Sequence, residues 1–278
     1  MEHGLYIIAT PIGNLGDITY RALGILKEAE IVACEDTRVT KKLFSLLDVD
    51  LNKKFITYQD HNEEERSLKI LEILRGGQSV VLVSDAGSPM ISDPGYKLVH
   101  QCKKEGIRVF SLPGACAVIC AMQLSGLPSN RFMFAGFIPN KDSGREKLFK
   151  EFQNLNSTLI FYETAPRILK TLTVMQKFFA DREIAVAREI SKMYEECQNG
   201  TAAELIAHFE KFEPKGECVI VVAPPAEKES IGESELIALI KDGLSTDSLK
   251  DVAKRLSDEL NLNKNEIYQL GLKIKNEI

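Results

Sequence analysis

Three loops of the sequence could hold a ligand, because each follows an apolar run of strand length and is rich in glycine and proline. They are residues 9–14 (ATPIGN), 84–95 (SDAGSPMISDPG) and 113–115 (PGA). Glycines in such loops let the backbone approach a ligand closely. The loops lack the glycine–lysine spacing of a phosphate-binding loop. We therefore expect a ligand held by backbone groups and small side chains, and a nucleoside carrying a positive sulfonium would fit.

A purely structural interpretation is also open for the loops, since glycine and proline commonly mark turns after strands. The two aspartates of loop 84–95 would then cap the following helix. We favour this interpretation for Asp93, which directly precedes Pro94 at the expected start of a helix.

The elements that must position the loops alternate along the first part of the chain. Apolar runs at 5–9, 31–34 and 79–84, and a further expected strand at 107–112, alternate with amphipathic stretches such as 63–74 and 95–105. Strands that are apolar throughout and alternate with helices are typical of a parallel sheet covered on both faces. In such a sheet the ligand crevice lies beyond the carboxyl ends of the strands. We predict an N-terminal α/β domain over residues 1–115.

A second α/β domain is predicted over residues 116–225, with strands at 132–137, 158–162, 183–188 and 217–223 and helices at 145–154, 165–179 and 201–212. Pro224 and Pro225 mark its end. Residues 226–278 form a small helical domain, in which Leu249, Val252 and Leu256 mark one apolar stripe and Ile267, Leu270 and Ile274 another. This domain could complete the fold, contact another subunit or dock on RNA.

Composition limits the class of protein. The chain has 278 residues, of which 44% are hydrophobic and 27% charged, as in a soluble globular protein. No signal peptide or membrane-spanning run is recognisable. The six cysteines form no CxxC pair and no metal-like spacing, so we expect reduced thiols in a cytoplasmic protein without a metal site. The net charge of −5 is not that of a general nucleic-acid binder.

Several segments together resemble the tetrapyrrole-methylase superfamily, in its branch of bacterial 16S rRNA ribose 2′-O-methyltransferases. They are ATPIGNLGDITYRAL (9–23), CEDTR (34–38), HNEEER (61–66), VSDAGSPMISDPGYKLV (83–99), LPGACA (112–117), GLPSNRFMFAGFIP (126–139) and LIFYET (159–164). The resemblance covers about residues 4–222, and the helical tail is also similar to that of the branch. Gln59 and Pro166 stand where the branch commonly has histidine.

The resemblance implies two α/β domains with S-adenosylmethionine in the cleft between them, usually in a homodimer. It also implies methylation of cytidine 1402 of 16S rRNA, in the small ribosomal subunit near the decoding centre. By the same resemblance, the cofactor would contact Pro11, Gly13, Asp85, Ala86, Gly87, Ser88, Pro89, Pro113, Gly114, Ala115, Phe161, Tyr162 and Ala187.

Methyl transfer to a ribose hydroxyl would benefit from a general base. The candidates beside the loops are Asp36, His61 and Glu163, and the sequence does not rank them. His61 could equally be a solvated surface residue, and Asp36 could belong to a structural ion pair. Arginine suits phosphate contacts, and the candidates for RNA binding are Arg21, Arg38, Arg145, Arg167 and Arg188.

Two other functions stay open. One is methylation of a small porphyrinoid by the same fold. The first loop, ATPIGNLGDIT in place of a GPG-D type loop, and the helical tail argue against it. The other is a non-catalytic RNA-binding or assembly factor, which predicts that no S-adenosylmethionine is bound.

Overall fold

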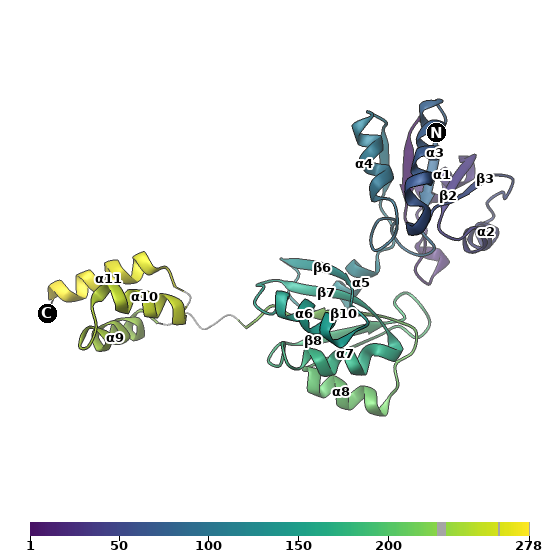
Figure 1. Ribbon diagram of the computed structural model, residues 1–278. Helices are drawn as coiled ribbons and strands as arrows, with labels where there is room; N and C mark the ends of the chain where they lie inside the picture. The colour runs from purple at the N-terminus through teal and green to yellow at the C-terminus, as the bar shows by residue number, and fades with distance from the viewer. Residues whose placement is uncertain (227–231, 261, 278) are drawn as a thin grey trace. The chain divides into compact units, whose positions relative to one another are not determined.

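The computed structural model describes residues 1–226, 232–260 and 262–277 (Figure 1). The chain divides into one compact unit over residues 1–225 and a second over residues 226–278. Each unit has its own apolar core, and each is described by itself below.

The first sheet is parallel throughout, in the order β3-β2-β4-β1-β5, as the continuously apolar runs predicted. Its strands are β1 (Leu5–Ile8), β2 (Ile31–Cys34), β3 (Lys54–Thr57), β4 (Val80–Val83) and β5 (Val109–Leu112). The helices that connect them are α1 (Tyr20–Glu28), α2 (Thr37–Leu46), α3 (Glu63–Arg75) and α4 (Tyr96–Lys104).

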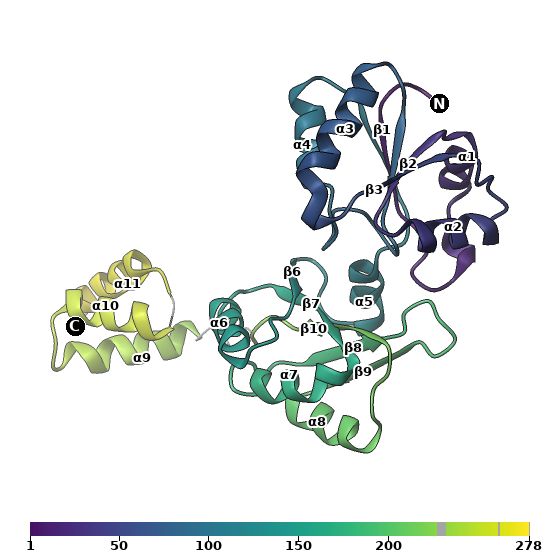
Figure 2. The ribbon, with the colours of Figure 1, turned by 45° about the vertical axis from the view of Figure 1, so that its right-hand side comes forward.

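Both faces of this sheet are covered. Leu71 of α3 and Leu98 of α4 pack with Leu82 on one face, whereas Leu26 of α1 and Phe44 of α2 pack on the other. Figure 2 shows α3 with α4 on one side of the strands and α1 with α2 on the opposite side. The carboxyl ends of the strands therefore open at an edge that no helix of this layer covers.

The second sheet is mixed, in the order β6-β7-β10-β8-β9, with β10 antiparallel to both neighbours. Its strands are β6 (Phe132–Phe137), β7 (Thr158–Thr164), β8 (Ile184–Arg188), β9 (Glu196–Gly200) and β10 (Glu217–Val222). Helices α6 (Asp142–Phe152), α7 (Ile168–Met175) and α8 (Ala202–Lys211) cover one face. Helix α5 (Ala117–Ser125) packs on the other.

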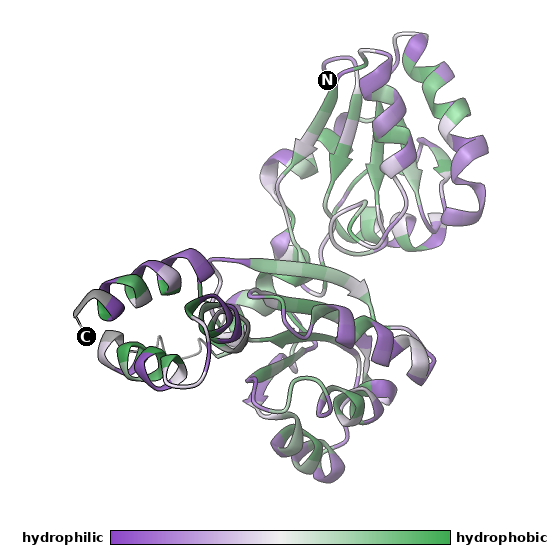
Figure 3. Ribbon diagram, turned by 60° about the vertical axis from the view of Figure 1, so that its left-hand side comes forward, coloured by the Kyte–Doolittle hydropathy of each residue, from purple (hydrophilic) through white to green (hydrophobic). Residues whose placement is uncertain are grey.

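Strand β9 was not predicted. Its sequence, ECQNG, has no apolar alternation, and it is a strand because it pairs in antiparallel register with β8. Figure 3 shows the strands of both sheets largely hydrophobic, with hydrophilic residues on the outer faces of the helices.

The second unit contains α9 (Glu233–Leu244), α10 (Leu249–Leu260) and α11 (Lys264–Glu277). Both predicted apolar stripes face one core, because Val252 and Leu256 pack with Ile267 and Ile274. Ile240 of α9 completes this core. Within the described residues, no helix has the length and apolarity that crossing a membrane requires.

Candidate active site

The three glycine- and proline-rich loops are joined to one another. Thr10 and Gly87 exchange two backbone hydrogen bonds, with N···O distances of 2.9 and 3.0 Å. The Ser88 hydroxyl donates to the carbonyl of Ala115 at 3.2 Å, which ties the middle loop to the third. The loops therefore form one surface at the carboxyl ends of β1, β4 and β5.

Two glycines make this close approach possible. Gly87 has φ of +81°, a left-handed conformation that residues with a Cβ adopt only with strain. A Cβ on Gly114 would stand 2.7 Å from the Cβ of Ala9, which is closer than two carbon atoms can pack. The glycines thus serve the packing of the loops against each other as well as any approach to a ligand.

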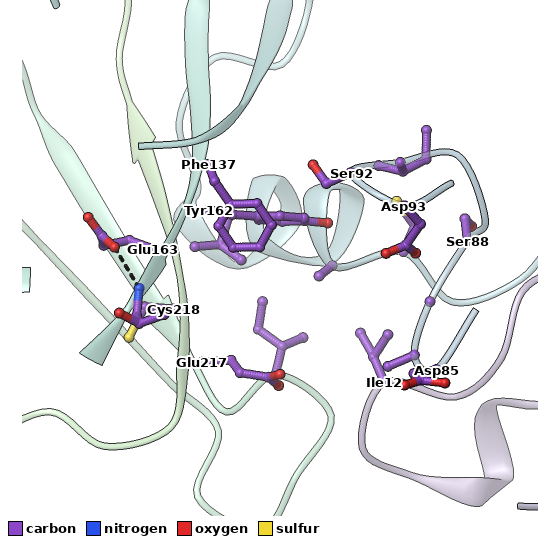
Figure 4. Close-up of a pocket in the computed structure, with 18 of the residues that line it drawn as sticks. Ile12, Asp85, Ser88, Ser92, Asp93, Phe137, Tyr162, Glu163, Glu217 and Cys218 are labelled. Carbon is purple, nitrogen blue, oxygen red and sulfur yellow. Dashed lines mark hydrogen bonds between the residues drawn. The ribbon is translucent and has the colours of Figure 1, made fainter. Parts of the chain in front are cut away.

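A cavity of about 390 Å³ opens beside this loop surface. That volume lies within the range of small-molecule sites. Its walls come from the loops of the first sheet and from β6, β7 and β10 of the second, as Figure 4 shows for the labelled residues. The residues that line it include Ile12, Glu35, Asp85, Ala86, Gly87, Ser88, Ile91, Ser92, Asp93, Cys116, Phe137, Tyr162, Glu163, Ile190 and Glu217.

The cavity is acidic on the side of the first sheet. Burial is the main cause that raises the pKa values of Glu35, Asp85 and Asp93, and repulsion from neighbouring carboxylates adds to it in each case. None of the described residues that line the cavity is a lysine or an arginine. Such a wall favours a positive charge on a bound ligand and disfavours a phosphate.

Asp93 has the most perturbed carboxyl group in the cavity. Burial raises its pKa to about 6, assisted by Asp85 and Asp60, while a hydrogen bond with Ser84 acts in the opposite direction. A carboxylate with a pKa near neutrality can accept a proton efficiently.

Comparison with known proteins assigns the chain to a family. The model of the tetrapyrrole (corrin/porphyrin) methylases matches residues 4–206. The chain is a tetrapyrrole methylase. It is 40% identical to "Ribosomal RNA small subunit methyltransferase I" of Synechocystis sp., over 98% of each chain. It is 43% identical to the protein of that name from Erythrobacter litoralis, over 99% of this chain and 96% of that one.

Solved structures confirm the fold of this methylase. The methyltransferase CobJ superposes with a TM-score of 0.61 at 17% identity, covering 81% of this chain and 95% of that one. A diphthine synthase superposes with a TM-score of 0.60 at 16% identity, covering 79% and 89%. These similarities establish the two-sheet architecture predicted from the sequence.

Five of the thirteen predicted cofactor residues line the cavity of the methylase, namely Asp85, Ala86, Gly87, Ser88 and Tyr162. Pro11 and Gly13 flank the lining residue Ile12. Pro89, Pro113, Gly114 and Ala115 belong to the joined loops but do not line the cavity themselves.

Phe161 and Ala187 lie elsewhere. Successive side chains of a strand point to opposite faces, so Tyr162 reaches the cavity whereas Phe161 packs on Phe149 of α6, with ring centroids 5.8 Å apart. Ala187 is fully buried in the core beneath α5.

The three predicted base candidates are not brought together. Asp36 forms an ion pair with Arg38 (2.6 Å), whose hydrogen bonds lower the pKa of Asp36 to about 2. Such a weak base is poorly suited to accept a proton. His61 is exposed in the short 3-10 helix (Asp60–Asn62) that precedes α3, and it does not line this cavity.

The Glu163 side chain is fully buried and turned toward α7. Thr171 Oγ1 donates to it at 2.6 Å, the amide of Thr164 at 2.8 Å, and Arg167 Nε lies 3.0 Å away. Glu163 is among the residues that line the cavity, but its carboxylate is held by partners within the second sheet and its helices.

The predicted RNA-binding arginines differ in accessibility. Arg21 and Arg38 are exposed. The Arg145 side chain is 2% exposed and pairs with Asp142, so a phosphate contact there would require this pair to break. Arg167 pairs with Glu163, and Arg188 pairs with Glu196.

Sequence reasoning missed one residue that positions the site. Glu63, buried in the first turn of α3, accepts hydrogen bonds from the backbone amides of Gly95 (3.1 Å) and Lys97 (3.3 Å). It thereby caps α4, whose own N-cap residue is Gly95. The cap of α4 comes from another helix, which leaves the Asp93 carboxyl beside the cavity.

Proposed function

We propose that this chain transfers the methyl group of S-adenosylmethionine to the 2′-hydroxyl of cytidine 1402 in 16S rRNA. The observation that carries the proposal is the identity of about 40% to ribosomal RNA small subunit methyltransferases I over nearly the whole chain. We further propose that it acts as a cytoplasmic homodimer on the small ribosomal subunit.

The residues of the cavity fit S-adenosylmethionine. Asp85, Asp93 and Glu35 would attract the positive sulfonium, and the backbone of loop 84–95 would contact the nucleoside. The apolar side chains of Ile12 and Ile190 offer contact area for the adenine ring and the methionine carbons. The demethylated product is uncharged at sulphur, so the acidic wall would bind it less tightly than the methyl donor.

The mechanism that follows is an in-line displacement. When bound, S-adenosylmethionine supplies a methyl group on a positively charged sulphur. The ribose 2′-oxygen would take this methyl group in place of its proton, and the carboxylate of Asp93 would accept the proton. The loops that hold Asp85 and Asp93 contribute positioning, which supplies much of the rate in such a reaction. Asp93 thus replaces Asp36, His61 and Glu163 as our candidate base.

The RNA would be recognised mainly by the shape of the assembled particle. The net charge of −5 and the acidic cavity oppose general attraction to RNA. Arg21 and Arg38 are exposed and are our candidates for local phosphate contacts. Free short RNA should therefore bind weakly, and tight, salt-insensitive binding of any RNA would contradict this part of the proposal.

Methyl transfer from labelled S-adenosylmethionine tests the proposed function. We expect label in the RNA of small ribosomal subunits, and none in a porphyrinoid such as uroporphyrinogen III. If the protein binds the cofactor but labels only the porphyrinoid, its function is small-molecule methylation. An absence of S-adenosylmethionine binding would favour a non-catalytic assembly factor.

A further inference from the structure

Phe137, at the end of β6, combines exposure with rigid support. It lines the cavity, yet 57% of its surface is exposed. Large aromatic side chains are usually buried because of their apolar area, and an exposed one beside a site calls for a functional explanation. We propose that Phe137 is the platform on which the base of the target nucleotide stacks while its ribose is methylated, an inference that rests on the proposed function.

The ring of Phe137 is supported from within the cavity. It packs edge-on against Tyr162 at 5.2 Å between ring centroids, and Tyr162 packs in the same manner against Phe134 at 4.8 Å. Figure 4 shows Phe137 and Tyr162 together on the cavity wall, across from Asp93 and Ser92. One face of the Phe137 ring can therefore contact a ligand while the ring keeps its packing against Tyr162.

The backbone around Phe137 is fixed as well. Before it, a β-bulge interrupts the pairing of β6 with β7, and Gly136 has φ of +73°. After it, the carbonyls of Ile138 and Pro139 both accept hydrogen bonds from Arg167.

Arg167 is itself held by the buried carboxylate of Glu163, 3.0 Å away. Glu163 is among the residues that line the cavity, but its carboxylate is engaged by Arg167 and by Thr171. The effect of the pair with Arg167 is to fix the residues that follow Phe137, so that the exposed ring has a defined position before any ligand arrives.

The chemistry of the cavity identifies the ligand of Phe137 as a nucleobase rather than a phosphate. The opposite wall is acidic, and stacking on an aromatic ring requires a flat ligand face that carries no negative charge. An unpaired base turned out of an RNA helix supplies such a face, while its phosphates can stay outside the cavity.

The loop that carries Asp93 also lies next to the bulge that carries Phe137. A Cβ on Gly136 would stand 3.9 Å from the hydroxyl oxygen of Ser92, the residue before Asp93. A nucleotide whose base stacks on Phe137 would therefore bring its ribose toward the carboxylate that we propose as the proton acceptor.

Kinetics of three Phe137 variants and one control variant test the platform with small ribosomal subunits as substrate. Phe137→Ala and Phe137→Leu should lower kcat/KM for subunits by about 5- to 150-fold, the range found when a base loses an aromatic stacking partner. Phe137→Tyr should stay within about 3-fold of the wild type because it keeps the ring. Phe132→Ala removes a ring from the other end of β6, 44% exposed and outside the cavity, and should change nothing.

Calorimetric titration of S-adenosylmethionine without RNA separates the two aromatic ligands that could stack here. The dissociation constant should stay within about 2-fold of the wild type in all Phe137 variants. A rise in this constant equal to the loss of kcat/KM would mean that Phe137 stacks on the adenine of the cofactor, and would overturn the proposal. Full activity of Phe137→Leu would also overturn it. If the wild-type enzyme methylates no ribosomal substrate, the proposed function fails, and the platform fails with it.

Discussion

The carboxylate of Glu63 in α3 accepts a hydrogen bond from the backbone amide of Gly95, 3.1 Å away, at the start of α4. The same oxygen accepts from the amide of Lys97, and the hydroxyl of Tyr58 donates to it at 3.2 Å. One buried acid therefore joins two helices at the end of the loop that carries Asp85 and Asp93.

Replacing Glu63 should destabilise this junction. Glu63→Ala leaves the amide of Gly95 without a protein acceptor, and an unsatisfied buried donor costs about 1–3 kcal/mol of the free energy of unfolding. Glu64→Ala, the exposed neighbour in the same turn, should cost less than about 1 kcal/mol. Urea unfolding measures both. Equal losses in the two variants would show that the hydrogen bonds of Glu63 contribute nothing beyond the helix dipole.

Asp93→Asn should abolish most of the activity while the cofactor still binds. A positioned base contributes about 10²- to 10⁴-fold to a rate, and asparagine cannot accept the proton. In the wild type, the rate should rise with pH through about 6 and then level off, because only the ionised form of Asp93 acts as a base.

His61→Ala is the control for this pH profile, because His61 is the other candidate base that the sequence offered beside the loops. His61 does not line the cavity, so the variant should keep both the rate and the profile. If His61→Ala lost the rise in rate near pH 6 and Asp93→Asn kept full activity, His61 would be the base instead of Asp93.

The same aspartate should lower the stability of the enzyme at neutral pH. Burial raises its folded-state pKa to about 6, above the unfolded value, so the folded state binds the proton more tightly. Its stabilising contribution is present below about pH 4 and is lost as pH rises through 6. Asp93→Asn should therefore be more stable than the wild type at pH 7, by about 1–2 kcal/mol after allowance for partial exposure.

Chemical unfolding of the two proteins at pH 7 and at pH 4 measures this difference. The gain should shrink at pH 4, where the wild-type carboxyl is protonated in the folded state and about half protonated in the unfolded state. When a functional group is held in an unfavourable environment, replacing it should give a protein that is inactive and more stable. A variant that is inactive and less stable would instead indicate a structural role for Asp93.

Gly114 should tolerate no side chain. Gly114→Ala places a methyl group 2.7 Å from the Cβ of Ala9, so we expect a loss of about 1–3 kcal/mol from overpacking and a raised KM for S-adenosylmethionine. Gly24→Ala is the matched control, because a Cβ there has open space on an exposed helix and should stabilise by about 0.5–1 kcal/mol. Unchanged stability and KM in Gly114→Ala would mean that the loops are not closely packed.

The fold could be predicted from the sequence wherever a pattern of apolar residues reflects burial directly. Apolar runs such as 79–84 predicted β4 and its parallel sheet, and the position of three loops after strands predicted that they converge. Strand β9 could not be predicted in this way, because its polar residues form a strand only through pairing with β8.

The site was predictable only in part. Phe161 and Tyr162 were both expected at the cofactor, although neighbouring residues of a strand must point to opposite faces, a rule that the sequence alone would have supported. Asp93 was expected to cap α4, but the residue that caps it is Glu63, which lies thirty residues earlier in the chain. Tertiary contacts of this kind leave no local pattern.

The position of the methyl group on the RNA tests the central claim most directly. Small ribosomal subunits would be incubated with the enzyme and S-adenosylmethionine, and the 2′-O-methyl group mapped by primer extension at low dNTP concentration. We predict a single stop that reports methylation of the ribose of cytidine 1402, present with the wild type and strongly reduced with Asp93→Asn. Methylation at other riboses only, or on a base instead of a ribose, would contradict the account.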